Sequence, residues 1–116
     1  MKNQKGIALY LSIIIMVILL AVVLGISTIL TSQLKVIRDI ENSVVAYYAA
    51  ETGIEQALDI RSNPTSLNGH SESLSNGAVY IIEVLEGGES GCSAANYCIK
   101  SVGAYNNANR AIQAAY

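Results

Sequence analysis

The residues from Gly6 to Leu34 form a run of 29 residues without a formal charge, and most of them are aliphatic. As an α-helix this run would be roughly 44 Å long, against about 30 Å of hydrocarbon in a bilayer. A cleaved secretory signal has an apolar region of only about 7–15 residues, followed by a small-x-small cut site. This run is about twice that length, and no convincing cut site follows it. We therefore expect residues 7–34 to form a retained membrane-spanning helix.

The charges on either side of this segment predict its orientation. Lys2 and Lys5 precede it, whereas the residues that follow it, from Lys35 to Glu41, carry both signs. Because positively charged flanks stay on the cytoplasmic side, the N-terminus is expected inside and residues 35–116 outside. Those residues include 5 basic and 9 acidic side chains, a formal charge of −4. Nucleic acid and anionic lipid both attract basic surfaces, so neither is an expected partner of this part, and DNA capture is disfavoured.

The helix is predicted to continue beyond the membrane, through residues 35–61. This stretch lacks proline and keeps a 3.6-residue apolar period, until Pro64 disfavours helix at the residue before it. Residues 7–60 would then form one helix of roughly 80 Å. One face carries bulky apolar side chains, namely Ile37, Ile40, Val44, Tyr47, Tyr48 and Leu58. The opposite face carries small residues that let another backbone come close, namely Ala46, Ala49, Ala50, Gly53 and Ala57.

The rest of the chain, residues 62–116, predicts a small antiparallel sheet. Residues 62–76 are polar and rich in turn formers, which indicates a loop. Strands are expected at 77–86, 97–105 and 110–116, with a hairpin turn at Asn106-Asn107-Ala108-Asn109. Three strands would cover one face of the exposed half of the helix. The expected fold is therefore α+β, with a long N-terminal helix and a sheet packed on its C-terminal half.

Cys92 and Cys98 are the only cysteines in the chain. Five residues separate them, which fits neither a C-x-x-C redox motif nor the spacing of zinc ligands. The lone His70 lies in a polar loop away from both. Because an exported location permits oxidation, a structural disulfide is favoured over a metal or redox site. No metal and no cofactor are expected.

A row of carboxylates, Glu51, Glu55 and Asp59, follows the helix at a spacing of four residues. Glu55 and Asp59 are interpreted as a solvated edge. Glu51 differs because it projects into the bulky apolar stripe between Tyr48 and Leu58, where a charge needs a partner. That partner is either a backbone amide of the covering sheet or a cation from another subunit.

The sequence favours a non-enzymatic protein that contacts other helices. Its single histidine makes most catalytic triads impossible, and it contains no phosphate loop and no nucleotide fingerprint. Ala21 and Gly25 form a small-xxx-small pattern in the apolar segment, which favours helix–helix contact, although Gly25 could equally be a soft point in the helix.

Two motifs carry a family resemblance. The basic leader Met1-Lys-Asn-Gln-Lys-Gly6 ends in glycine and runs directly into Ile7-Ala8-Leu9. It resembles the class III signal of type IV pilins and pseudopilins. Further along, Ala49-Ala50-Glu51-Thr52-Gly53 resembles the Ala-Ala-Glu-x-Gly stretch of PilX-type minor pilins, which similarly start Gly-Ile-Ala-Leu. The resemblance covers the first 60 residues well and the rest in outline.

The resemblance implies a route of processing and assembly. A prepilin peptidase would remove the leader, residues 1–6, by cutting after Gly6, and would methylate the new N-terminal residue, Ile7. Subunits would wait in the inner membrane, where an assembly platform extracts them into an extracellular filament with other pilin-like subunits. The apolar helix would pack in the filament core. Residues expected at assembly contacts are Leu11, Ala21, Gly25, Ala46, Ala49, Ala50, Glu51, Gly53 and Ala57.

Leu11 departs from the family pattern. It stands fifth after the expected cut, where pilin families usually place a glutamate that pairs with the N-terminal amine of a neighbouring subunit. PilX-type and tip pseudopilins often lack this glutamate too, so a minor subunit is expected rather than the major repeating one. The alternative is a single-span inner-membrane protein with a small extracytoplasmic binding domain that does not polymerise. The apolar length of the helix beyond the membrane favours the filament.

Overall fold

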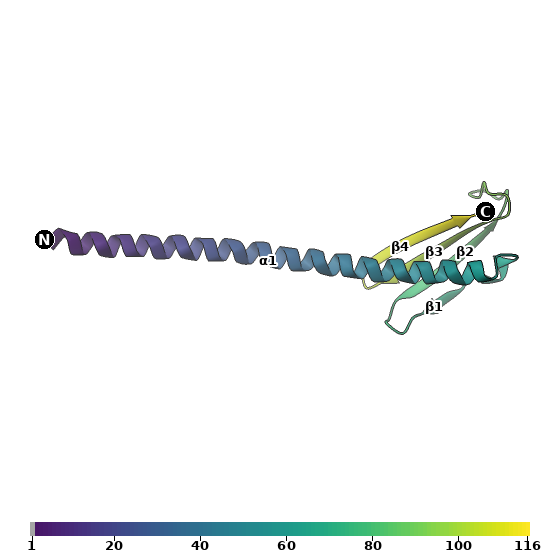
Figure 1. Cartoon of the computed structure of the whole chain (residues 1–116), viewed down its shortest axis with the longest axis horizontal. Helices are drawn as coiled ribbons and strands as arrows, with labels where there is room; N and C mark the ends of the chain where they lie inside the picture. Colours follow the sequence, from purple (N-terminus) through teal and green to yellow (C-terminus); the bar gives the residue numbers. More distant parts are fainter. Residues whose placement is uncertain (1) are drawn as a thin grey trace. The chain divides into compact units, whose positions relative to one another are not determined.

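The computed structural model describes residues 2–116, with the side chain of Lys2 and the leader residue Met1 outside the described part. One long helix comes first and a group of strands follows (Figure 1). The elements are α1 (Lys2–Asp59), η1 (Pro64–Leu67), β1 (Ser71–Ser73), β2 (Val79–Glu86), β3 (Tyr97–Tyr105) and β4 (Ala108–Ala115). The strands form one antiparallel sheet that packs against the C-terminal part of α1, which confirms the expected α+β fold.

The chain divides into two units, of which the first ends at Ile37 and the second comprises Arg38–Tyr116. The first unit is helical throughout its described residues and is long and apolar enough to cross a membrane. The helix begins before Ile7, because the polar leader residues contain no proline and Gly6 alone does not stop it. Four of its hydroxyl groups donate to carbonyl oxygens within the same helix, which makes them compatible with hydrocarbon. These hydroxyls belong to Ser12, Ser27, Thr28 and Thr31.

The sheet has four strands in the order β1-β2-β3-β4, one more than expected. The additional strand, β1, lies within the segment that was predicted to be a loop, and it pairs Glu72 with Tyr80 of β2. The short helix η1 lies in the same segment, beginning at Pro64. Three polar residues form a strand here because β2 supplies the pairing partner, so the tertiary context overrides their low strand propensity.

The β3–β4 hairpin is tighter than expected. Tyr105 pairs with Ala108, so only Asn106 and Asn107 form the turn, and β4 begins two residues before the expected Arg110. Asn106 has a φ of 51°, in the left-handed region that asparagine tolerates better than most residues.

The core of the second unit lies between α1 and one face of the sheet. Tyr80, Ile82 and Val84 of β2 and Ile99 of β3 are buried there. The helix side of this core consists of small residues together with one isoleucine, namely Ala46, Ala49, Ala50, Gly53, Ile54 and Ala57. Small side chains allow the sheet to approach closely: a Cβ at Gly103 of β3 would lie 2.6 Å from the backbone nitrogen of Ala50.

Candidate assembly surfaces

The small-residue face of α1 is occupied by the chain's own sheet. Ala46, Ala49, Ala50 and Ala57 are completely buried, and a Cβ at Gly53 would lie 2.9 Å from the Tyr80 ring. The prediction that this face contacts another subunit is therefore wrong for this fold. The backbone that comes close belongs to β3 of the same chain. Periodicity correctly grouped these residues on one face, but it did not say which segment covers them.

The bulky apolar face of α1 is left open by the sheet. Within the second unit Leu58 of this face is 37% exposed, and the four residues nearer the N-terminus, Ile40, Val44, Tyr47 and Tyr48, have exposed fractions of 58%, 46%, 48% and 62%. The rings of Tyr47 and Tyr48 meet edge to face, with centroids 6.0 Å apart. Four large apolar side chains so exposed on one helix face are typical of a contact surface rather than of a solvated helix. We call these four residues the open apolar face.

Glu51 lies beside the open apolar face, one turn beyond Tyr47 and Tyr48. Its side chain is partly buried, and it forms no hydrogen bond or ion pair with any other described residue. The interpretation that a backbone amide of the covering sheet meets Glu51 is wrong, because the sheet covers the opposite face of the helix. Of the two partners considered, only the cation from another subunit stays a prediction.

The residues assigned to processing and to contacts in the apolar segment all lie on the exposed surface of α1. Ile7 and Leu11 have exposed fractions of 62% and 55%, and a Cβ added at Gly6 or Gly25 would meet no atom within 4 Å. Ala21 is exposed as well. These positions are thus accessible to a peptidase or a neighbouring helix, and their roles stay predictions.

Cys92 and Cys98 form a disulfide, as expected, with their Cα atoms 5.6 Å apart. Cys98 is the second residue of β3, and Cys92 lies in the loop that joins β2 to β3. This loop packs on itself, because a Cβ at Gly87 would lie 2.7 Å from the carbonyl oxygen of Ala94. Within residues 2–116, no three His, Cys, Asp or Glu side chains come together as a candidate metal site.

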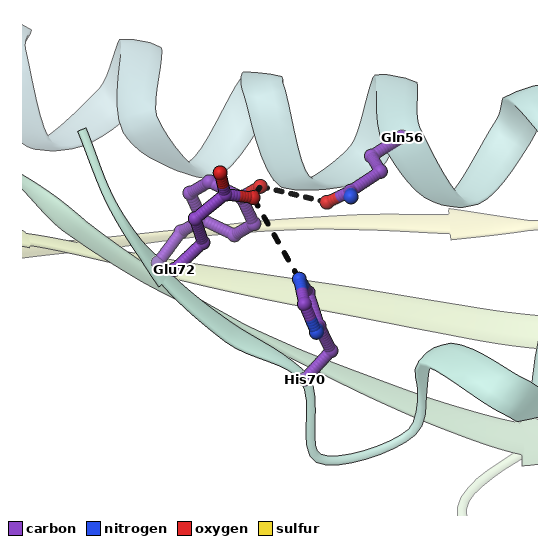
Figure 2. Close-up of polar contacts among 4 residues, drawn as sticks. Gln56, His70 and Glu72 are labelled. Atoms are coloured by element: carbon purple, nitrogen blue, oxygen red, sulfur yellow. Dashed lines mark hydrogen bonds and ion pairs between the residues drawn. The ribbon is translucent and has the colours of Figure 1, made fainter. Parts of the chain in front are cut away.

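A polar cluster that the sequence did not predict joins β1 and β2 to α1 (Figure 2). The Tyr80 hydroxyl lies 2.7 Å from Glu72 Oε2 and 2.7 Å from Gln56 Oε1. A phenol has one proton, and donation to the carboxylate is the stronger bond. A hydrogen bond to Gln56 as well requires the amide of Gln56 to be rotated, so that Nε2 takes the place of Oε1 and donates to the phenol oxygen. His70 completes the cluster, with Nε2 lying 3.7 Å from Glu72 Oε2.

Burial, the hydrogen bond to Glu72 and the negative charge of that residue, in this order of size, together raise the pKa of the Tyr80 phenol to about 12. All three effects disfavour the phenolate. Tyr80 therefore stays protonated at neutral pH and holds β1 by donating to Glu72. A buried tyrosine opposite a polar strand is the one sequence signal that could have revealed this cluster.

A shallow pocket of about 370 Å³ lies beside the β3–β4 turn. Arg110 of β4 reaches into it and donates from Nη2 to Ser43 Oγ at 3.0 Å and from Nη1 to the carbonyl oxygen of Asn109 at 3.1 Å. Asn106 Nδ2 donates to Asn42 Oδ1 at 3.1 Å. These bonds tie the hairpin to the helix in the second unit, and Arg110 has no carboxylate partner among the described residues.

Three features of the second unit are thus available to a partner: the open apolar face, the unpartnered Glu51 beside it, and the polar hairpin that carries Arg110.

Comparisons of the chain with protein-family models, with curated proteins and with solved structures gave no match.

Proposed function

We propose that the protein is a structural, non-enzymatic subunit of a type IV pilus-like or type II secretion-like filament, and a minor one. The observation that carries the proposal is the open apolar face. The sheet packs on the small residues of α1 and leaves Ile40, Val44, Tyr47 and Tyr48 exposed. A helix that is apolar on the face its own domain does not use is expected to pack against other helices.

The first unit supports the same role. Its apolar part is long enough to cross a bilayer before assembly, and four of its hydroxyl groups are hydrogen-bonded inside the helix. On assembly this segment would exchange lipid for neighbouring helices, so close packing rather than the hydrophobic effect would decide its stability there. Ala21 and Gly25 would allow such packing. We propose an inner-membrane location with the N-terminus inside before assembly, and an extracellular filament afterwards.

The test uses the full chain in its own cells, with surface filaments removed by shearing. The chain should appear in the sheared fraction, and its intact mass should correspond to a protein that starts at a methylated Ile7. Gly6→Trp should leave uncut precursor in the membrane, because a bulky side chain blocks the cut. Detection of residues 1–6 on protein from sheared filaments would contradict the processing step.

A pair of variants tests the open apolar face itself. Val44→Lys places a charge on this face, at a side chain that is exposed in the folded unit, so folding should be retained while the chain disappears from the sheared fraction. Ser90→Lys adds the same charge in the exposed β2–β3 loop and should leave incorporation unchanged. Equal incorporation of both variants would overturn the proposal. Wild-type protein that stays in the membrane would instead favour the non-polymerising, single-span alternative.

A further inference from the structure

β4 is an open edge of the sheet. It is the last strand in the order β1-β2-β3-β4, it has eight residues, and it contains neither proline nor lysine, which often protect such edges. Its residues 109, 111, 113 and 115 are all exposed. An exposed edge of this length is a template for a further strand.

The hydrogen bonds show which backbone groups of β4 are free. Tyr97 and Tyr116 exchange both of their backbone hydrogen bonds, at 3.0 and 3.1 Å, so they form a hydrogen-bonded pair. Such pairs recur every two residues, so alternate residues from Ala108 to Ala114 also bond to β3. The N–H and C=O groups of the residues between them point away from β3. These residues are Asn109, Ala111, Gln113 and Ala115.

The opposite edge of the sheet, β1, offers a shorter row of the same kind. Ile82 donates to the carbonyl oxygen of His70, and Leu74 donates to that of Ala78. By the same alternation Glu72 bonds to β2, which leaves the backbone groups of Ser71 and Ser73 pointing outward. All three residues of β1 are exposed.

The two edges carry opposite charges. Arg110 is the only charged residue of β4, and Glu72 is the only charged residue of β1. Arg110 has no carboxylate partner among residues 2–116. Glu72 contacts Tyr80 and His70 through Oε2 alone, so Oε1 is available, and its side chain is 53% exposed. A second copy of this chain thus presents to β4 an edge of complementary charge.

We propose that β4 of one copy pairs antiparallel with β1 of a second copy, so that the sheet continues from one subunit into the next. One register satisfies both the backbone and the charges: Asn109 opposite Ser73, Arg110 opposite Glu72, and Ala111 opposite Ser71. The first and last pairs use the free backbone groups of both edges. Arg110 and Glu72 lie on the same side of the joined sheet, since their strand partners Gly103 and Tyr80 both face α1.

The direction of the strands selects this contact over self-pairing of β4. Within one sheet β1 and β4 run in opposite directions, so an antiparallel β4–β1 contact leaves both copies in the same orientation. Two copies joined by antiparallel β4 strands would instead be reversed relative to each other. Copies that share an orientation can join head to tail in a continuing row, whereas a reversed pair is closed; here the inference rests on the proposed function. The contact needs only two neighbouring copies, so it is compatible with a subunit that is present in few copies.

Cysteine crosslinking in membranes tests the register, with the full chain expressed in two forms in the same cells. Asn109→Cys in one form and Ser73→Cys in the other should give a disulfide-linked dimer, because paired Cα atoms about 5.5 Å apart are within disulfide range. Asn109→Cys with Ser71→Cys, two residues out of register, should not. Crosslinking between Ala111→Cys and Gln113→Cys copies would show self-pairing of β4 and overturn the proposal, as would absence of any link between positions 109 and 73.

A matched pair of variants tests the backbone contact. Ala111→Pro removes a free N–H that β3 does not use, so the unit should fold while the yield of the 109–73 crosslink falls at least about tenfold. Ala111→Ser keeps the N–H and should keep the yield. Retention of the Cys92–Cys98 disulfide in both variants reports the fold. An unchanged yield with Ala111→Pro would overturn the proposal.

Charge reversal is a second test of the contact between β4 and β1. Arg110→Glu opposes like charges, and the crosslink yield should fall roughly tenfold. Arg110→Lys keeps the positive charge and should keep the yield; a loss as large as that of Arg110→Glu, in a chain that keeps its disulfide, would count against the pairing of charges. The membrane fraction separates this inference from the filament. If the crosslink forms in membranes but the chain is absent from sheared filaments, the strand pairing is retained and the filament proposal is rejected. If the chain is present in filaments but no crosslink forms, the filament proposal is retained and the strand pairing is rejected.

Discussion

Gly103 of β3 lies against the carbonyl oxygen of Ala46 in α1, with no room for a side chain between the strand and the helix. This contact is backbone against backbone, so no flexible side chain can move aside. Gly103→Ala should therefore force the helix and the sheet apart and lower the free energy of unfolding by about 3 kcal/mol.

Thermal or denaturant unfolding of the full chain in detergent measures this loss. Ser101→Ala, two residues earlier on β3, is the matched control. The buried Ser101 hydroxyl has no hydrogen-bond partner among the described residues, so its removal should cost little or even stabilise the protein. Equal effects of the two variants would mean that the helix and the sheet are not as close as described.

The raised pKa of Tyr80 predicts that the folded protein loses stability at high pH. Its pKa is raised from about 10 to about 12 in the folded protein, which therefore holds the phenol proton more tightly than the unfolded chain does. The stabilising effect is fully present below pH 10 and is lost as the pH rises through 12. Tyr80→Phe removes the bond to Glu72 and should destabilise by about 2 kcal/mol at pH 7.

Unfolding of the wild type and of Tyr80→Phe at pH 8 and pH 11.5 checks this expectation. The titration of groups that both proteins share cancels in the difference between their free energies of unfolding. The stability difference between them should shrink at the higher pH. Tyr105→Phe serves as the control, since the Tyr105 hydroxyl forms no hydrogen bond with another described residue. A difference that stays constant with pH would contradict the role of the phenol proton.

The Cys92–Cys98 bond should be present in exported protein and should contribute modestly to stability. The loop that it closes is short, so the chain-entropy estimate for its contribution is about 2 to 2.5 kcal/mol. Alkylation before and after reduction counts free thiols, and unfolding of a Cys92→Ser/Cys98→Ser variant measures the stability. Two free thiols in freshly isolated native protein would disprove the bond in the cell.

The leucine at position 11 predicts that this chain has a low copy number in filaments. A buried N-terminal amine gains strongly from a nearby carboxylate because water is excluded there, and leucine supplies none. The chain should therefore be a small fraction of the subunits in sheared filaments, as measured by quantitative mass spectrometry. If it proves to be the dominant component, the minor-subunit assignment is wrong, although the α+β fold stands.

The long helix and the strand expected at 77–86, which is β2, were predictable because their signals are local. An uncharged run of 29 residues and a stretch of β-branched and aromatic residues each indicate their own conformation. β1 has no such signal: Ser71, Glu72 and Ser73 form a strand only because β2 lies beside them. Polar segments of this kind cannot be recognised before their partner is placed.

The covering of α1 was misjudged for a related reason. Periodicity shows which residues share a helix face but not what lies on it. The bulky face is the ordinary choice for a core, yet here the sheet packs on alanines and glycine. One signal was available, since Gly103 is the single glycine of the strand at 97–105, and an isolated glycine in a strand often marks a close approach of another backbone.

The use of small residues for the intramolecular core has a consequence for the order of events in the cell. Folding of residues 38–116 and burial of the open apolar face draw on different side chains of α1. The two processes therefore do not compete, and Ile40, Val44, Tyr47 and Tyr48 can change surroundings while the core between α1 and the sheet stays closed. A subunit built this way can finish folding first and be transferred afterwards without reopening.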